Sequence, residues 1–440
     1  GRIRTYVNVV SGLDYIFSMN IVLACLTVGK TWFERWYSRG TLWLEPLDIV
    51  SDMKLVSDII KKDGLRDKEE WFKFVECANL YGYKNHFEGD GFDIFDEARK
   101  LAEAGTTNRN SPDGSEWMTY FAGACERILS PGQSKDVPYI SFYDYVHSPE
   151  MWETSGSSST GKLRWKFWEE EGEFKVRKNL LADVIDLDDL YYKCLATDKQ
   201  VNISLEKNEL SKIRIAVASD IETYLKMSWI LHLSGSWYLN WPGSTIEEDP
   251  SAQYARMRDM IELAQKYWSL PFDYAAFDHQ PTTAEVRCIS KVVTAKARVK
   301  IPASERTIFE KIAASIDRGF LDAVLKTRGF SEQKQKQTKI KIDKIVKKLQ
   351  KEEVVRVTGG VMSGLRLTTL LGNGWNTIMC QAAQEYLETT FCRRVDVPRY
   401  VRGDDSAIST SNYYLALLFR QCLATVGAEG NNSKFGIHKG

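Results

Sequence analysis

The sequence predicts a globular protein of the mixed α+β class. Helical patterns, with apolar residues three or four positions apart, alternate with short apolar runs that favour strands, and residues 399–410 predict a strand, a turn and a second strand. The composition agrees, since 43% of the 440 residues are hydrophobic and 59 Lys and Arg balance 59 Asp and Glu. Such a composition excludes a disordered tail, a collagen and a coiled coil.

The elements of the C-terminal half can be placed from periodicity and from residues that end helices. Helices are predicted at 251–268, 282–297, 305–326, 364–391 and 412–427, the last ending at Gly427, and a buried strand at 269–278. The Ser/Gly-rich residues 154–162 predict a flexible loop. Helical patterns also occur within residues 1–150, for example at 51–64 and 69–82, without residues that suggest chemistry.

Two features limit the cellular setting. The apolar run 15–29 contains Ser18 and Asn20 and is shorter than the roughly 20 residues that span a bilayer, so it predicts a buried helix. The eight cysteines are never closer than twelve residues, which excludes a zinc knuckle and a CxxC redox pair and indicates a reducing compartment. The chain begins with Gly1 and not with Met, which suggests a fragment or a processed product.

Two groups of acidic residues carry the candidate chemistry. Asp273 and Asp278 lie in an apolar strand pattern, where a carboxylate is costly unless it binds a cation or accepts hydrogen bonds. Asp404 and Asp405 follow Gly403 between two strand-like stretches, and a divalent cation relieves the repulsion between such neighbours. Each pattern alone also fits a solvated turn.

The order of four segments resembles the motifs of viral RNA-dependent RNA polymerases. DYAAFD (273–278) resembles motif A, the Ser-Gly loop and helix start at 363–377 resemble motif B, and VRGDD (401–405) resembles motif C. Upstream, residues 207–220 have the K-x-E-x-x-K-x-R spacing of motif F, and residues 427–436 resemble motif D. Among subfamilies, the chain looks most like the polymerases of totivirus-like double-stranded RNA viruses.

This resemblance implies a right-hand polymerase fold, with an antiparallel palm sheet flanked by helices. Residues 273–440 then form the palm, with a fingers insertion near 285–357. Residues 151–272 form fingers that carry a motif G-like loop and motif F, and residues 1–150 are an N-terminal extension packed on the fingers. The thumb of the family is largely absent from this chain.

The resemblance also implies a role for each matching residue. Catalysis falls to Asp273, Asp404, Asp405 and Lys434, of which the three aspartates bind metal. Nucleotide binding falls to Lys207, Lys212, Arg214, Asp278, Ser363, Gly364, Thr368 and Asn373. Oxygen ligands without nearby Cys or His favour Mg²⁺, or Mn²⁺, over zinc.

Three of these assignments have a clear chemical reason. Lys212 and Arg214 carry the charge that meets an incoming triphosphate. Asp278 can accept a hydrogen bond from the ribose 2′-hydroxyl, the group that distinguishes RNA from DNA. The family has asparagine four residues after Thr368, where this chain has Gly372, so Asn373 and Asn376 are both candidates for the missing amide.

The expected reaction is RNA-templated transfer of a nucleoside monophosphate from an NTP to an RNA 3′-hydroxyl by a two-metal mechanism, for viral genome transcription and replication. The implied partners are the RNA template and product, NTPs and a viral capsid protein, with no membrane. The implied location is the virion interior or the host cytoplasm. The basic residues 326–351 fit either an RNA backbone contact or a solvated helical face.

Three alternatives remain open. A P-loop ATPase or helicase could use 156–162, although Leu163 stands where such a loop has Ser or Thr. A noncatalytic capsid or replicase scaffold could retain a polymerase-like fold. A reverse transcriptase is disfavoured by Asp278.

Overall fold

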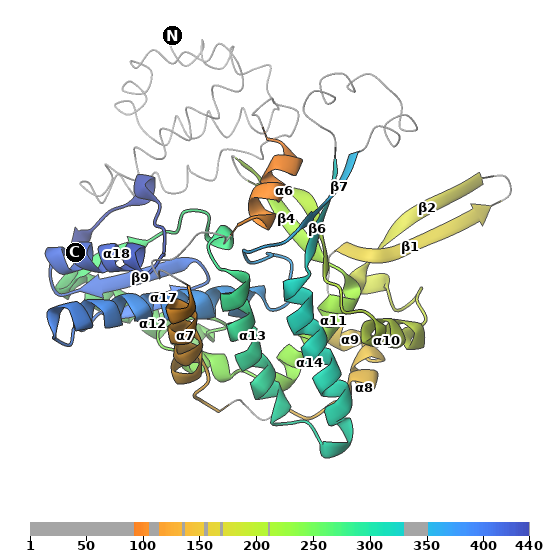
Figure 1. The fold of residues 1–440 in the computed structure, drawn as a ribbon, viewed down its shortest axis with the longest axis horizontal. Coiled ribbons are helices and arrows are strands. Elements are labelled where there is room, and N and C mark those ends of the chain that lie inside the picture. Colours follow the sequence, from red (N-terminus) through yellow and green to blue (C-terminus); the bar gives the residue numbers. More distant parts are fainter. Residues whose placement is uncertain are drawn as a thin grey trace, which may run out of the picture. The chain divides into compact units, whose positions relative to one another are not determined.

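The structure is a computed structural model that describes residues 92–104, 114–133, 137–153, 157–167, 170–209, 212–329 and 351–439 (Figure 1). The chain divides into two compact units, one of residues 1–94, 206–215 and 330–349 and the other of the remaining residues. Most of the described residues belong to the second unit. The helices expected at 15–29, 51–64 and 69–82, and most of the basic segment 326–351, lie outside the described residues.

One four-stranded sheet, with strand order β10-β5-β9-β8, has antiparallel pairing throughout. Its strands are β5 (Trp268–Phe272), β8 (Arg399–Arg402), β9 (Asp405–Thr410) and β10 (His438–Lys439). The long helix α17 (Thr368–Phe391) and the helix α18 (Tyr413–Thr425) pack on each other and on strands of this sheet. The predicted strand, turn and strand at 399–410 and the helix before Gly427 are confirmed.

A second four-stranded sheet has the order β4-β3-β6-β7. Its strands are β3 (Val201–Glu209), β4 (Lys212–Ser219), β6 (Val324–Gly329) and β7 (Lys351–Arg356). Strands β3 and β6 are parallel, whereas β6 and β7 are antiparallel. Helices together with antiparallel strand pairs agree with the predicted α+β class, and the right-hand architecture and its three-part division stay predictions.

Helices form the apolar core of the second unit. Helices α11 (Ile221–Ser234), α13 (Thr283–Arg298) and α14 (Arg306–Leu321) pack side by side (Figure 1). Other described helices are α7 (Ser115–Ala124) with the π-helical turn η3 (Cys125–Leu129), α8 (Phe142–Val146), α9 (Pro149–Trp152), α10 (Leu187–Ala196) and α12 (Pro250–Lys266). In the described residues, no helix is both long and apolar enough to cross a membrane.

A buried carboxylate joins three of these helices. Thr282 and Glu285 form a capping box at the start of α13, as the helix prediction at 282–297 allows. The fully buried Glu285 carboxylate also accepts hydrogen bonds from the indole N–H groups of Trp117 in α7 and Trp375 in α17, at 2.7 and 2.8 Å. The Glu285 side chain therefore caps the start of α13 and connects this helix to α7 and α17.

The prediction of a strand at 269–278 is wrong for the second half of this range. Strand β5 ends at Phe272, Ala276 has a left-handed backbone (φ 49°), and Phe277–His279 form a 3₁₀ turn. The reason is a change of partner: beyond Phe272 the backbone no longer pairs with β9 but bonds to residues 429–431, with the Asn431 N–H donating to the Asp273 carbonyl at 2.7 Å. Asp273 and Asp278 are an odd number of positions apart, so a strictly alternating strand has to end or bend between them, and the structure agrees with this prediction.

The prediction of a flexible loop at 154–162 is also wrong for most of this range. Residues Ser157–Phe167 form strand β1, which pairs with β2 (Glu170–Arg177) in an antiparallel hairpin. A P-loop needs a loop between a strand and a helix, so this hairpin contradicts the ATPase alternative. Two helices are shorter than predicted, because α14 ends at Leu321 and α17 begins at Thr368.

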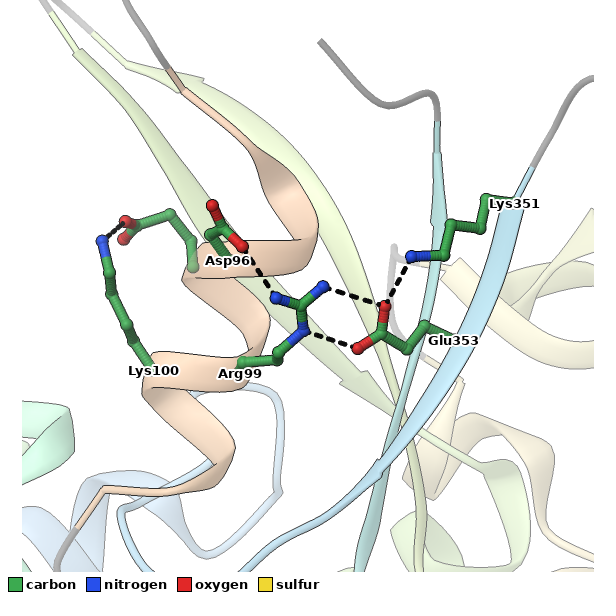
Figure 2. A network of polar contacts seen from close by, with 6 residues as sticks. Asp96, Arg99, Lys100, Lys351 and Glu353 are labelled. Carbon is green, nitrogen blue, oxygen red and sulfur yellow. Dashed lines mark hydrogen bonds and ion pairs between the residues drawn. The ribbon is translucent and has the colours of Figure 1, made fainter. Parts of the chain in front are cut away.

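An ion-pair network attaches helix α6 (Ile94–Ala102) to strand β7, as Figure 2 shows. The Arg99 guanidinium donates to both carboxylate oxygens of Glu353, at 2.6 and 3.2 Å, and also to Asp96. Lys351 donates to the same Glu353 carboxylate. The hydrogen bond from Arg99 is the main cause that lowers the pKa of Glu353 from 4.5 to about 2.

We expect Glu353→Gln to lower the free energy of unfolding by about 1 kcal/mol at pH 7, the range of a partly exposed ion pair. Because the folded-state pKa is depressed, this stabilisation is present above pH 4.5 and is lost as the pH falls towards about 2. Urea unfolding of both proteins across that range measures the difference. Glu97→Gln, which removes an ion pair internal to α6, is the control and should change stability less. A difference that does not shrink in acid would contradict the role of this pair.

Candidate active site

The β8–β9 hairpin presents two acidic residues at its turn. Arg402 pairs with Asp405, so Gly403 and Asp404 form a two-residue turn. Gly403 has a φ of 59° and Asp404 does not have a positive φ, the pattern of a type II′ turn, which favours glycine at its first position. Asp404 and Asp405 are both exposed to solvent. The sequence prediction of a hairpin tip at this motif is confirmed.

Strand register brings Asp273 to the same place. Phe272, the last residue of β5, lies opposite Ser406 of β9, so Asp273 follows at the end of the sheet that carries the turn. Although Asp405 is exposed as a whole residue, partial desolvation of its carboxyl, and next the negative charges of Asp404 and Asp273, raise the pKa of that carboxyl. Asp273 therefore shares one electrostatic environment with Asp404 and Asp405, although it lies far from them in the sequence.

Lys434 reaches this acidic group from the chain's end. It lies in the 3₁₀ turn Asn432–Lys434, and its Nζ forms an ion pair with Asp273 Oδ1 at 3.0 Å. The backbone bond from Asn431 to Asp273 holds the two segments together. The structure thus brings together all four residues expected in catalysis, while their catalytic roles stay predictions.

The carboxylates are of the kind that bind a hard divalent cation. Among the described residues, no three Asp, Glu, His or Cys side chains are arranged to hold one ion as they stand. Mg²⁺ is usually held by one or two carboxylates, with waters and substrate phosphates completing its octahedral shell. Asp273 and Asp404, with Asp405 beside them, offer the carboxylate oxygens and the negative charge that such a site requires of the protein.

The Ser-Gly loop packs tightly on the end of β4. A Cβ on Gly364 would lie 1.5 Å from the Val217 carbonyl oxygen, so only glycine fits. Ser363 Oγ accepts a hydrogen bond from the Val217 N–H at 3.3 Å, and the Thr368 hydroxyl donates to the Met362 carbonyl at 2.6 Å. These contacts shape the loop, and nucleotide contacts by its residues stay predictions.

Asp278 lies on the 3₁₀ turn that faces this loop. Its carbonyl accepts a hydrogen bond from the Val361 N–H at 2.8 Å. Gly360, with φ 82°, passes so close that a Cβ there would lie 2.7 Å from the same oxygen. The segment after Asp273 is thereby tied to the segment that leads into α17.

Helix α17 shows why Gly372 replaces the expected asparagine. A Cβ on Gly372 would already lie 3.1 Å from the ring of Phe277, so this position faces an aromatic side chain. Asn373 and Asn376 are fully buried, and both amides bond to the backbone of Gly403. Sequence reasoning missed this contact, although a spacing of three residues places both amides on one helix face.

The predicted nucleotide-binding residues of the motif F-like segment lie on strands β3 and β4. Lys207 is on β3, and Lys212 and Arg214 are on β4, within the stretch 206–215 that belongs to the first compact unit. Lys207 and Arg214 are exposed. Their contact with a triphosphate stays a prediction.

Comparison with known proteins agrees with the sequence motifs. No protein-family model matches the chain. The chain is 24% identical over 326 residues to the "Probable RNA-directed RNA polymerase" of Giardia lamblia virus (isolate Wang), and this alignment covers 73% of the chain. It covers 15% of that protein, so the chain spans a small part of its relative's length. The resemblance to polymerases of totivirus-like viruses is confirmed.

Because the Gly364 site leaves no room for a methyl group, we expect Gly364→Ala to lower the free energy of unfolding by about 1 to 3 kcal/mol. Urea unfolding at pH 7 measures the loss. The control is Gly123→Ala in α7, where nothing beyond the helix's own backbone and the neighbouring residues lies within 4 Å of the new Cβ. Alanine should stabilise that helix by up to about 1 kcal/mol. Equal stability of the two variants would contradict the packing of the loop on β4.

Proposed function

We propose that this chain carries the catalytic centre of a viral RNA-dependent RNA polymerase. The reaction is transfer of a nucleoside monophosphate from an NTP to an RNA 3′-hydroxyl, with release of pyrophosphate. The observation that carries the proposal is the convergence of Asp273 with Asp404 and Asp405 at one end of an antiparallel sheet. The similarity to the Giardia lamblia virus protein supports the same class of enzyme.

The acids are proposed to hold Mg²⁺, or Mn²⁺, with Asp273 and Asp404 as ligands and Asp405 beside them. The bound ions supply charge neutralisation at the attacking and leaving oxygens. The protein contributes fixed positions, since phosphoryl transfer depends mainly on orientation and electrostatic stabilisation. Lys434 provides a positive charge that already pairs with Asp273 and is proposed to help pyrophosphate leave.

The other predicted residues are proposed to bind the nucleotide. Lys207, Lys212 and Arg214 are proposed to contact the triphosphate, because cationic side chains bind phosphate oxygens strongly. Asp278 is proposed to sense the ribose 2′-hydroxyl. The Ser-Gly loop at 363–368 is proposed to shape the space for the nucleotide.

RNA template, RNA product and NTPs are the proposed ligands. A viral capsid protein as partner, and a location in the virion interior or the host cytoplasm, rest on the family resemblance alone. RNA-templated extension with labelled NTPs by the full chain is the decisive experiment. RNA binding without any extension would favour the noncatalytic scaffold.

We expect Asp404→Ala to reduce nucleotide addition to less than a few per cent of the wild-type rate, because a metal ligand acts in the transition state. RNA affinity, measured by filter binding, should persist. Asp396→Ala removes an exposed aspartate shortly before β8 and serves as the matched control with normal activity. Substantial extension by Asp404→Ala would reject the metal assignment.

We expect Asp278→Ala to lower the ratio of rNTP to dNTP efficiency by about tenfold or more. A site built to bond a hydroxyl disfavours a substrate that lacks it by about 1 to 3 kcal/mol per unsatisfied group. Measuring kcat/KM for both substrates on one RNA template gives the ratio. A wild-type preference for dNTPs would favour a reverse transcriptase, and an unchanged ratio in the variant would reject Asp278 as the selector.

A further inference from the structure

We propose that Asn373 and Asn376 are positioning residues that hold the Gly403-Asp404 turn by its backbone and so set where Asp404 and Asp405 stand relative to Asp273. The proposal assigns both amides to the turn and not to the nucleotide sugar. It rests on the proposed polymerase function and explains how the site of that function is kept in shape.

The two amides bind opposite polar groups of one residue. Asn373 Oδ1 accepts a hydrogen bond from the Gly403 N–H at 2.9 Å, and Asn376 Nδ2 donates to the Gly403 carbonyl at 2.9 Å. Both side chains are 0% exposed. Residues three apart on a helix lie on the same face, so α17 offers a donor and an acceptor side by side.

Asn376 also connects the turn to the neighbours of the other acids. Its Oδ1 accepts hydrogen bonds from the Tyr274 hydroxyl at 2.8 Å and from Ser406 Oγ at 3.0 Å. Tyr274 directly follows Asp273, and Ser406 directly follows Asp405. One buried amide therefore contacts residues adjacent to all three carboxylates.

Asn373 gives the turn a second attachment. Its Nδ2 donates to Ser244 Oγ at 3.2 Å, while the chain next to Ser244 bonds to the β8 strand through the Val401 N–H and the Gly243 carbonyl. The buried Asn373 amide thus links Ser244, beside β8, to the Gly403 N–H of the turn. Neither end of the side chain is left without a partner.

The turn needs such contacts because apolar packing does not hold it. Apart from its chain neighbours, no described atom lies within 4 Å of a Cβ placed on Gly403, and Asp404 and Asp405 are exposed and mutually repelling. Besides the pairing of β8 with β9, polar contacts from the buried side of the hairpin therefore fix the position of the turn. A catalytic group must be held within roughly 0.5 Å of its productive place.

The first test is Asn376→Leu, which keeps the approximate volume and removes the contacts to Gly403, Tyr274 and Ser406. We expect kcat for nucleotide addition to fall by about 10²-fold, as for a small misplacement of catalytic groups, with little change in KM for the NTP. Hydrogen–deuterium exchange of the peptide 399–407 should become faster. The exchange measurement does not require catalysis.

Thr377→Val in the same full-length chain is the matched control. Thr377 is the next residue of α17, is also 0% exposed, and donates one buried hydrogen bond to the Asn373 carbonyl at 2.8 Å. Its loss should lower Tm without changing exchange in 399–407 or kcat. General weakening of the helix would instead affect both variants alike.

A second pair of variants keeps the proposal testable if Asn376→Leu does not fold. Asn373→Asp retains an acceptor for the Gly403 N–H, and Ser244 can rotate to donate to the other oxygen, so the Gly403 amide should stay protected from exchange. Asn373→Leu removes the acceptor, and this amide should then exchange at least about tenfold faster, as for a lost buried hydrogen bond.

The outcomes separate this proposal from the polymerase function. The proposal is overturned if folded Asn376→Leu shows unchanged hydrogen–deuterium exchange at the turn and an unchanged kcat. It is also overturned if the variant has a normal kcat but a raised KM and an altered ratio of rNTP to dNTP efficiency, because that result indicates a contact with the sugar. If the wild type makes no RNA but Asn376→Leu loses exchange protection at the turn, the polymerase proposal fails and the hold on the turn stands.

Discussion

Mutual repulsion among Asp273, Asp404 and Asp405 is the constraint that the rest of the site must satisfy. The antiparallel register of β5 and β9 forces these carboxylates together, and burial with the neighbouring charges raises the pKa of Asp405. Lys434 offsets part of the charge through its ion pair with Asp273. A cation nearby would relieve the remaining repulsion, and the scaffold has to keep the hairpin from moving away.

Helix α17 supplies much of that scaffold. Its buried face carries Asn373 and Asn376 towards the turn, and Trp375 donates to Glu285, which caps α13 and also binds Trp117. A buried polar network of this kind is stable because its hydrogen-bonding groups find partners. The exposed acids are therefore connected, through helix α17, to the buried Glu285 of α13 and to Trp117 of α7.

The loop that begins α17 adds a steric constraint. Gly364 lies against the backbone of Val217, and Gly360 lies against the carbonyl of Asp278, so two glycines allow β4 and the 3₁₀ turn at 277–279 to approach the same loop. Neither position accepts a Cβ without displacing backbone.

The sequence by itself determined the features that depend on neighbouring residues: the strand, turn and strand at 399–410, the helix before Gly427 and the identity of the acids. Tertiary structure decided where β5 ends, because its partner after Phe272 is the distant segment 429–431. It also decided that residues 157–162 form a strand, that Lys434 meets Asp273, and that Asn373 and Asn376 bind Gly403. These features depend on contacts between residues far apart in the chain. A buried amide or a short polar segment can form several alternative hydrogen bonds, and only the folded structure determines which partners are within reach.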